Sequence, residues 1–443
     1  MGSRIARSSP SRARVRAAAL AALAFTSLAP ALAHADDAAP KLDSGDTTWL
    51  LVSTALVMLM TPGLALFYGG MVRKRNVLST FVHSLFSLAL ISVQWVVFGY
   101  SLAFGKTHGG LIGGAEFLFL KGVAYQTKGT TPHLAFMAFQ MMFAGITPAL
   151  ISGAFAERVR FGPYALFILL WSTFVYDPVA HWVWADGGWL ARFGAIDFAG
   201  GTVVHLSAGL SALVCAILIG KRLGYPGGKF IPHNLTMTVT GAGLLWFGWF
   251  GFNAGSALAA GQSAALALVT THTAAAAGTL GWLAAEAKHR GKPSALGAAS
   301  GLVAGLVAIT PAAGFVPPWA ALPIGLLAGV ICYVAVVLKG RLGYDDALDV
   351  FGVHGVGGLL GALLTGVFAQ RAFTPGNVPG LLQGGTKLLL AQLVAVAAAG
   401  TYAVVVTVAV WKLVDAITTI RVVDQDEREG LDVTLHGEEG YWE

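Results

Sequence analysis

The hydrophobic pattern divides the chain into long apolar segments separated by short polar stretches. Each segment reaches or approaches the ~20 residues that a helix needs to cross a bilayer, and the last is long enough to tilt or to project beyond it. The pattern predicts an all-α polytopic membrane protein with eleven transmembrane helices and a transmembrane domain over residues 45–415. The segments cover residues 47–70, 78–104, 133–155, 161–179, 200–220, 234–255, 262–287, 293–311, 318–338, 351–369 and 387–415.

Composition supports this class and narrows the partners. The chain of 443 residues is 56% hydrophobic and 11% charged, whereas a soluble domain carries about 25% charged residues. Its net charge of +6 comes from short basic clusters between apolar segments, which indicates membrane topology and membrane lipid rather than nucleic acid as the surroundings. Cys215 and Cys332 both lie inside apolar runs and suit packing. We expect no disulfide framework, no metal site and no cofactor.

The N-terminus has the pattern of a secretory signal peptide over residues 1–35. A basic stretch precedes a short apolar run, and Ala33-His34-Ala35 forms an A-x-A cleavage site before Asp36. The alternative is an additional N-terminal helix, which Pro30 disfavours because it interrupts the run. Cleavage would leave the mature N-terminus outside the cytoplasm.

The distribution of Lys and Arg predicts the same orientation. Alternate loops carry thirteen basic residues, and the loops on the opposite side with their edges carry six. The basic loops are therefore expected in the cytoplasm, which places the C-terminus there and the protein in the inner cell membrane. The thirteen are Arg73, Lys74, Arg75, Arg158, Arg160, Lys221, Arg222, Lys229, Lys288, Arg290, Lys292, Lys339 and Arg341.

Two short matches indicate an internal repeat. Ile-Thr-Pro-Ala occurs at residues 146–149 in the third segment and at 309–312 in the eighth, and V-H-x-x-x-G-L occurs at 204–210 in the fifth and at 353–359 in the tenth. Segments 1–5 therefore resemble segments 6–10. Because five is odd, the two copies would have opposite orientations. Such inverted repeats usually place a substrate path at their interface, near the middle of the membrane.

The second match puts one histidine, His205 or His354, into each copy, with no Asp, Glu, Lys or Arg in the surrounding apolar run. A titratable ring at that depth is expensive, so the pair needs a reason. Helix packing through a His–His hydrogen bond is one explanation. A metal site is weaker, because two histidines without a third ligand coordinate poorly. The symmetric placement favours the lining of a narrow pore, in which the rings stay mostly neutral or share one proton.

Aspartates and aromatic residues accompany the histidines. Asp197 and Asp349 precede His205 and His354, and each suits the N-terminal cap of its helix. Asp197 could in addition stabilise an arriving cation. Phe139 and Phe143 are four residues apart and would share one helix face. Aromatic faces with one hydroxyl could hold a small cation through cation–π contact and a hydrogen bond.

The sequence resembles the ammonium transporter (Amt/Mep/Rh) family, in its bacterial Amt branch. The resemblance runs from about residue 45 to 443. The segments that carry it are ALFYGGMVRKRNVLS (65–79), AFAERVRF (154–161), GAIDFAGGTVVH (194–205), GWFGFNAGSA (248–257), GLVAITPAAG (305–314), DVFGVHGVGG (349–358) and EREGLDVTLHGEEGY (427–441). The family implies a homotrimer in which each subunit of eleven helices has its own pore.

The resemblance also implies roles for individual residues. Trp184, Phe143 and Ser256 match the family's external ammonium-binding site, and Asp197 matches its essential aspartate. Phe143 and Phe252 match a gate of stacked phenyl rings, and His205 and His354 match the twin-histidine pair. Phe139 and Thr310 match the outer mouth and the pore wall, and Phe67, Tyr68 and Val350 match the inner constriction. Two departures are visible: the proline of the third segment, and one extra residue between Trp184 and Asp197.

The implied activity is ammonium transport. An apolar pore cannot hydrate a cation, so ammonium would lose its proton near Asp197 and Ser256 and cross as ammonia past the histidines. Two alternatives differ in class. An ammonium sensor would conduct little, and sensors of this family often carry an output domain for which about 28 residues after the last segment leave no room. A membrane enzyme lacks a paired nucleophile and base, so we expect no catalytic residues.

The C-terminal segment 416–443 is expected to be cytoplasmic and regulatory. Its residues 424–443 hold eight acids against one Arg, a composition that usually indicates a solvated tail. Gly430, Gly437 and Gly440 mark turns instead, and the acids could pack against the basic loops around residues 73–75 and 158–160. The resemblance implies docking of a PII-type signal protein and a role in nitrogen utilisation.

Overall fold

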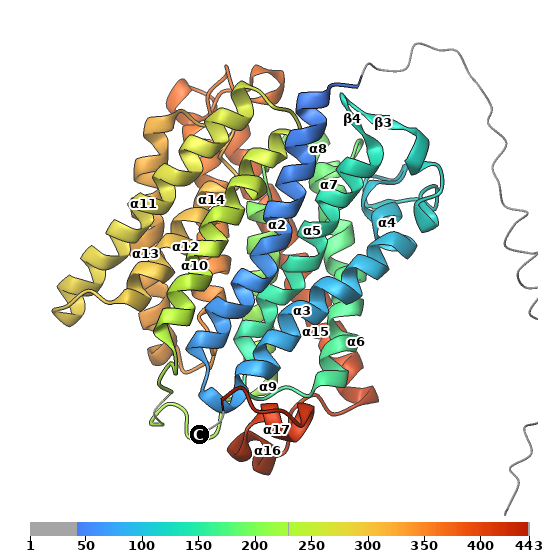
Figure 1. Ribbon diagram of the computed structural model, residues 1–443. Coiled ribbons are helices and arrows are strands. Elements are labelled where there is room, and N and C mark those ends of the chain that lie inside the picture. Colours follow the sequence, from blue (N-terminus) through green and yellow to red (C-terminus); the bar gives the residue numbers. More distant parts are fainter. Residues whose placement is uncertain (1–41, 229, 442–443) are drawn as a thin grey trace, which may run out of the picture. The chain divides into compact units, whose positions relative to one another are not determined.

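The computed structural model describes residues 42–228 and 230–441, so the expected signal peptide lies outside the described residues. Long helices run side by side along most of this part of the chain (Figure 1). The first half comprises α2 (Ser44–Met71), α3 (Val77–Gln94), η2 (Trp95–Gly99), α4 (Tyr100–Phe104), α5 (His133–Ser152), α6 (Phe161–Trp171), η6 (Ser172–Tyr176), α7 (Asp177–Trp184), α8 (Trp189–Phe193), η7 (Gly201–Leu206) and α9 (Ser207–Ile219).

The second half begins after the loop that follows α9. It comprises α10 (Leu235–Trp249), η8 (Phe250–Ala254), α11 (Gln262–Arg290), α12 (Ala295–Ile309), α13 (Ala321–Leu342), η11 (Phe351–Gly355), α14 (Val356–Phe368) and α15 (Lys387–Ile417), followed by the short helices α16 (Asp424–Glu429) and α17 (Leu431–His436). Single 3₁₀ turns occur at η1 (Lys74–Asn76), η3 (Leu118–Leu120), η4 (Val123–Tyr125), η5 (Gly153–Phe155), η9 (Gly255–Ala257), η10 (Pro318–Ala320), η12 (Pro375–Asn377) and η13 (Leu381–Gln383).

Among the described residues, the strands lie in the loop 105–132, and one isolated antiparallel bridge pairs Val159 with Arg421. Strands β1 (Thr107–His108) and β2 (Ile112–Gly113) form one antiparallel pair, and β3 (Thr127–Lys128) and β4 (Thr131–Pro132) form another. This loop lies at the end of the helices opposite to α16 and α17 (Figure 1). The fold therefore has a tail side, which carries α16 and α17, and an opposite side, which carries the strands.

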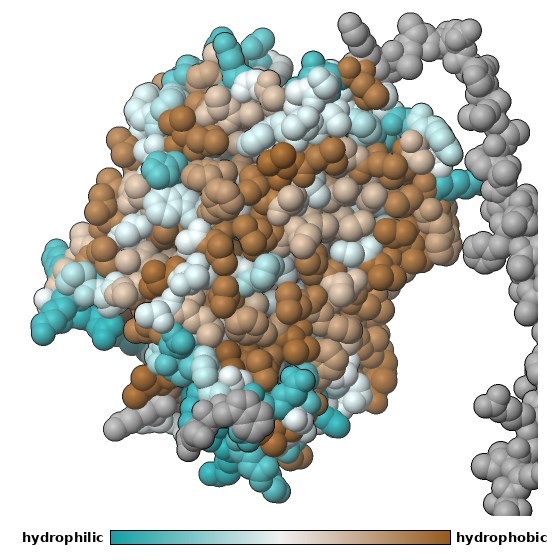
Figure 2. Space-filling view, viewed as in Figure 1, coloured by the Kyte–Doolittle hydropathy of each residue, from teal (hydrophilic) through white to brown (hydrophobic). Residues whose placement is uncertain are grey.

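Nine helices of the described residues are long and apolar enough to cross a membrane. Hydrophobic side chains cover the middle of the face in Figure 2, and hydrophilic ones gather toward its ends. The remaining two expected segments correspond to α11 and α12. Helix α12 has 15 residues, and α11 has 29 but is rich in Ala and Thr, which lowers its hydropathy. A polytopic helical membrane protein is thus confirmed, while the count of eleven and the inverted repeat stay predictions.

Several of the crossing helices contain a π-helical turn, an irregularity that is frequent at functional sites. The turns are η2, η6, η7, η8 and η11. Three of them carry residues singled out in the sequence: His205 in η7, Phe252 in η8 and His354 in η11. Each π turn changes the direction of these side chains relative to a regular helix, and so affects how His205, Phe252 and His354 approach one another.

Candidate functional site

The two histidines meet in the interior. The Nδ1 atoms of His205 and His354 lie 3.2 Å apart, and the rings are nearly parallel with centroids 5.2 Å apart. Both side chains are buried. A hydrogen bond between the two Nδ1 atoms needs a proton on one of them, and the tautomers of the rings decide which atom donates. The Nε2 atom of His205 is buried and has no hydrogen-bond partner.

The glycines of the repeated V-H-x-x-x-G-L sequence explain why the histidines can come together. A Cβ on Gly209 would lie 2.1 Å from the backbone nitrogen of Gly355, and a Cβ on Gly358 would lie 2.7 Å from the carbonyl oxygen of Gly201. Each motif's glycine therefore faces the start of the other motif's helix. Neither position tolerates a side chain, because the backbones of the two histidine turns approach too closely.

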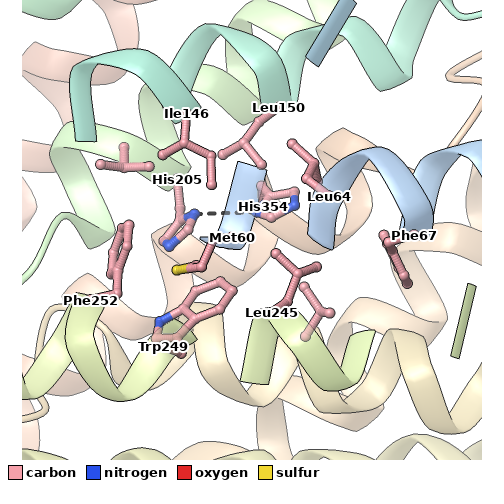
Figure 3. Close-up of a pocket in the computed structure, with 12 residues that line it drawn as sticks. Met60, Leu64, Phe67, Ile146, Leu150, His205, Leu245, Trp249, Phe252 and His354 are labelled. Atoms are coloured by element: carbon pink, nitrogen blue, oxygen red, sulfur yellow. Dashed lines mark hydrogen bonds between the residues drawn. The ribbon is translucent and has the colours of Figure 1, made fainter. Parts of the chain in front are cut away.

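The histidine pair lies in a narrow cavity, which we call the central cavity (Figure 3). His205 and His354 point toward each other in its middle, Phe252 lies toward the His205 end, and Phe67 lies at the opposite end beyond His354. Apart from the histidines and the indole of Trp249, the lining is hydrocarbon or thioether. It consists of Met60, Leu64, Phe67, Ile146, Leu150, Val204, His205, Leu245, Trp249, Phe252, Val303 and His354.

A second cavity, of about 420 Å³, brings together three predicted ammonium-binding residues, Phe143, Trp184 and Ser256. We call it the mouth cavity. The Phe143 and Trp184 rings are perpendicular, with centroids 6.0 Å apart, and the Ser256 hydroxyl donates to the Phe252 carbonyl at 2.9 Å. The other lining residues are Phe104, Phe136, Gln140, Phe198 and Leu258.

The rings of Phe143 and Phe252 separate the two cavities. Their centroids are 4.2 Å apart at an interplanar angle of 31°, and both side chains are almost completely buried. Phe143 lines the mouth cavity and Phe252 lines the central cavity. Phe139 supports this stack with its ring centroid 5.0 Å from that of Phe143. The stack closes the route between the cavities in this conformation.

Asp197 caps the helix that begins with His205's π turn. Its Oδ1 accepts from the backbone N–H groups of Gly200 and Gly201 at 2.8 Å, and its Oδ2 accepts from Thr202 and Val203 at 2.8 and 3.1 Å. Burial raises the pKa of Asp197, and the four N–H donors partly oppose that shift. The structural role expected for Asp197 is therefore present.

Trp184 and Asp197 are in contact despite the extra residue between them in the sequence. The Trp184 indole N–H donates to the carbonyl oxygen of Asp197 at 2.9 Å. This bond fixes the indole, and its face then borders the mouth cavity next to the phenyl stack. The other departure, Pro148, is accommodated inside α5, which continues to Ser152.

The expected cap by Asp349 is wrong. Its backbone is left-handed, with φ +62°, and its carboxylate pairs with the Lys339 ammonium group. The carboxylate that accepts from the start of η11 belongs to Asp346, whose Oδ2 binds the Phe351 N–H at 2.8 Å. Burial raises the pKa of Asp346 to about 6, and Lys339 opposes that shift. Spacing alone could not separate the two aspartates, because both precede η11 by a few residues and only the left-handed backbone of Asp349 excludes it as the cap.

The other predicted residues lie around the cavities rather than all inside them. Phe67 lines the central cavity, while the Tyr68 hydroxyl donates to the Leu150 carbonyl at 3.0 Å. Tyr68 and Val350 both approach Gly153, where a Cβ would lie 2.7–2.8 Å from them. Thr310 is buried behind the cavity and accepts from the Trp249 indole N–H at 2.9 Å.

Two residues of the site were not assigned a role from the sequence. Trp249 stacks on His205 with ring centroids 5.3 Å apart and an interplanar angle of 22°. Gln140 lines the mouth cavity, and its Oε1 is buried without a hydrogen-bond partner. Trp249 lies in the motif 248–257, three residues before Phe252, and Gln140 lies between Phe139 and Phe143, so a polar or indole group within one turn of an assigned aromatic residue was the available signal.

The C-terminal segment is packed on the tail side rather than solvated. The Asp432 carboxylate accepts from the backbone N–H groups of Leu78 and Ser79 at 3.0 and 2.8 Å and so caps α3. Glu427 accepts from the Leu223 N–H at 2.6 Å and pairs with Arg421 at 2.7 Å. The segment also packs against the two expected basic loops through backbone groups: the Arg75 guanidinium donates to the Glu427 carbonyl at 3.5 Å, and the Val422 N–H donates to the Arg158 carbonyl at 3.2 Å.

A buried ionic network joins those loops beneath the segment. Glu157 binds Arg73 at 2.9 Å and Arg222 at 3.0 Å, and Arg222 also binds Asp345 at 2.8 Å. Burial alone would raise the pKa of Glu157 and of Asp345, but the guanidinium groups lower both below their usual values. Both carboxylates thus stay ionised at neutral pH, and the network holds together the loops on which the C-terminal segment packs.

Comparisons with known proteins agree with this geometry. The model of the Ammonium Transporter Family matches residues 48–441. The ammonium transporter of Bacillus subtilis is 51% identical over 90% of this chain and 99% of that protein, and ammonium transporter Amt1 of Archaeoglobus fulgidus is 46% identical over 90% and 100%. The crystal structure of Mep2 from Saccharomyces cerevisiae superposes with a TM-score of 0.82 at 39% identity, covering 86% of this chain and 88% of that one. A structure described as a sensor Amt protein reaches 0.83 at 30% identity, over 88% and 98%.

Proposed function

The chain belongs to the Ammonium Transporter Family, and we propose that it transports ammonium across the cytoplasmic membrane by conducting ammonia past His205 and His354. The observation that carries the proposal is the sequence of compartments: a mouth cavity, a phenyl stack, and an apolar cavity centred on a hydrogen-bonded histidine pair. A hydrated cation has no polar path through such a series, whereas a neutral amine of the same size needs none.

Recruitment would take place in the mouth cavity. The Trp184 and Phe143 rings offer their π faces to a cation, and the Ser256 hydroxyl and the unpartnered Oε1 of Gln140 are available hydrogen-bond acceptors. The Asp197 carboxylate adds negative charge behind the indole. Ammonium would give up its proton at this end. We propose that this end faces the cell exterior and that the tail side faces the cytoplasm.

Passage of ammonia depends on the histidines. Each neutral ring can accept a hydrogen bond from ammonia or donate one to it, and the Nε2 of His205 has no protein partner. Phe67 and Tyr68, with Val350, would form the inner constriction before reprotonation in the cytoplasm. We place one such pore in each subunit of a homotrimer.

The test uses the purified chain in liposomes. Ammonium-evoked current and internal pH are recorded together, with K⁺ as the matched control cation. Ammonium should produce a rapid internal pH change that empty liposomes do not show, and K⁺ should produce no current. Flux of K⁺ equal to that of ammonium would contradict the proposal, because it would require a hydrated ion path. A current that accompanies the pH change would show that the proton crosses too.

A sensor function is the second candidate, favoured by the similarity to a sensor Amt protein and by the ordered C-terminal segment. In this alternative, ammonium would bind in the mouth cavity and alter the docking of the segment, with little flux. Saturable ammonium binding without an internal pH change in the liposomes would select it. Transport at rates well above empty liposomes would select the transporter.

We propose that the C-terminal segment regulates transport and forms part of a docking site for a PII-type signal protein. Deleting residues 424–443 removes Glu427 and Asp432 and leaves the N-terminus of α3 uncapped, so transport and PII binding should both fall. Deleting only residues 437–443 leaves α16 and α17 in place and is the matched control for transport. Equal uptake and equal capture of PII by the 424–443 deletion and the full chain would overturn the regulatory role.

A further inference from the structure

The loop 105–132 turns back along the outside of the helix that precedes it. The Ser101 hydroxyl donates to the Gly114 carbonyl at 2.7 Å and accepts from the Phe117 N–H at 3.0 Å. Further on, η3 packs against η2. Because η2 ends five residues before Phe104, the last residue of that crossing helix, η3 lies roughly 8–14 Å below the helix end at 1.5 Å per residue. The turn therefore lies beside the end of this crossing helix rather than beyond it.

The turn at η3 sorts its side chains into an inner and an outer set. Phe119 and Leu120 both have left-handed backbones, with φ 52° and 55°, which is uncommon for such residues. Phe117 and Leu120 pack against the protein core, and Phe117 lies 5.6 Å from the Tyr100 ring centroid. The Phe119 side chain points away and is 72% exposed. Its exposure is thus a consequence of a folded turn.

Other exposed apolar side chains accompany Phe119 on the loop and on the helix that it packs against. Leu118 and Leu111 are also exposed, and Val93, on the crossing helix just before η2, is 62% exposed. Lys121 and Tyr125 follow on the same loop and are exposed as well. An apolar tip flanked by Lys and Tyr is the composition of protein surfaces at the membrane interface, where rings and long basic chains sit at the headgroups.

We propose that the tip of loop 105–132, residues 117–125, is a membrane-interface anchor whose Phe119 and Leu118 insert into the bilayer leaflet opposite to the tail side. Its partner is the lipid surface, with Phe119 among acyl chains and with Lys121 and Tyr125 at headgroup level. The packing of η3 on η2 favours lipid over a second copy of the chain, since Val93, just before η2 on the same crossing helix, is an exposed apolar side chain. Anchoring there would hold the loop whose other end, at Thr130, binds the first described residues through Asp43.

Nitroxide labelling tests the anchor in the full chain reconstituted in liposomes. The two native cysteines, Cys215 and Cys332, are completely buried, so an introduced surface cysteine is labelled selectively. Labels are placed by Phe119→Cys and, as a second position, Leu118→Cys. Val93→Cys is the lipid-facing reference and Glu438→Cys, on the exposed end of the C-terminal segment, is the aqueous reference. Collision with oxygen reports lipid, and collision with a water-soluble nickel chelate reports water.

We expect the labels at 119 and 118 to match the Val93 reference, with oxygen collisions exceeding nickel collisions. Nickel accessibility equal to that of the Glu438 reference would overturn the anchor, because the tip would then lie in water. Inaccessibility to both reagents, with an immobilised spectrum, would overturn it in favour of a neighbouring copy of the chain. The test is independent of transport, so it stands or falls separately from the proposed function.

Discussion

The two histidine-bearing turns carry the same V-H-x-x-x-G-L sequence but begin in different electrostatic surroundings. At η7, the Asp197 carboxylate accepts four backbone N–H groups, and no Lys or Arg of the described residues pairs with it. At η11, Asp346 accepts from Phe351, and Lys339 contacts both the Asp349 carboxylate and the Asp346 carbonyl. One entrance keeps an unpaired anion and the other places a cation beside its anions.

The difference teaches how a symmetric centre can have asymmetric ends. Backbone N–H dipoles stabilise the Asp197 carboxylate without cancelling its formal charge, so an approaching cation is still attracted there. Lys339 offsets the negative charge on the tail side. We therefore expect a cation to be favoured at the mouth near Trp184 and less favoured at the other end. The central cavity between them is lined mainly by hydrocarbon around the same pair of rings.

The largest effect is expected from removing the symmetric histidine pair. Replacing both His205 and His354 by Leu should abolish ammonium-selective flux in liposomes, because the central cavity then has no hydrogen-bonding group on the ammonia path. Met60→Leu, in the same lining, is the matched control and should transport normally. A double variant that folds and keeps the flux and selectivity of the unmodified protein would reduce the pair to helix packing.

Removing the unpaired anion should come next. Asp197→Ala deletes both the charge and the acceptor of four N–H groups. We therefore expect transport to be lost and the free energy of unfolding in detergent to fall by about 2–4 kcal/mol. Asp197→Asn removes the charge but keeps one acceptor oxygen for the helix cap, so it distinguishes the two roles. If it recovers stability but not transport, the charge matters. Full transport by Asp197→Ala would contradict any role of this entrance in binding a cation.

The other entrance should respond to pH. The pKa of Asp346 is about 6 in the fold, against 3.8 for an ordinary Asp, so the protonated form favours folding and ionisation destabilises it. The free energy of unfolding falls as pH rises from about 4 through 6. Above that range the ionised Asp346 has lowered it by about 3 kcal/mol relative to acidic pH. The melting temperature of Asp346→Asn minus that of the unmodified protein should therefore increase as pH rises through this window and stay constant above it. Asp186→Asn, on an exposed ion pair, controls for charge. A gap independent of pH would count against a protonated Asp346.

The smallest effect is expected at the aromatic wall. Trp184→Leu removes a cation–π contact of about 1–2 kcal/mol, which corresponds to a roughly 5–30-fold higher half-saturation for ammonium. Trp182→Leu, on the same helix but outside both cavities, is the control. An unchanged half-saturation in the Trp184 variant would place the recruiting charge entirely with Asp197 and sharpen the difference between the two entrances.

The sequence by itself determined the class and the centre of the site. Apolar segments of membrane-spanning length fix the helices because backbone groups in lipid must be paired within their own segment. The two histidines stood out because titratable residues at that depth are costly. The grouping of Phe143, Trp184 and Ser256 around one cavity, predicted from the family resemblance, agrees with the lining of the mouth cavity.

Tertiary structure decided what depends on how separate segments meet. Trp249 stacks on His205 only because the end of α10 brings it there. Asp346 rather than Asp349 caps η11, because Asp349 itself has a left-handed backbone and its carboxylate pairs with Lys339. The acids of the C-terminal segment are ordered because the start of α3 and the loop after α9 present backbone N–H groups to them, and Arg421 of the same segment pairs with Glu427. Local sequence does not encode such contacts, since each depends on the geometry of two backbones at once.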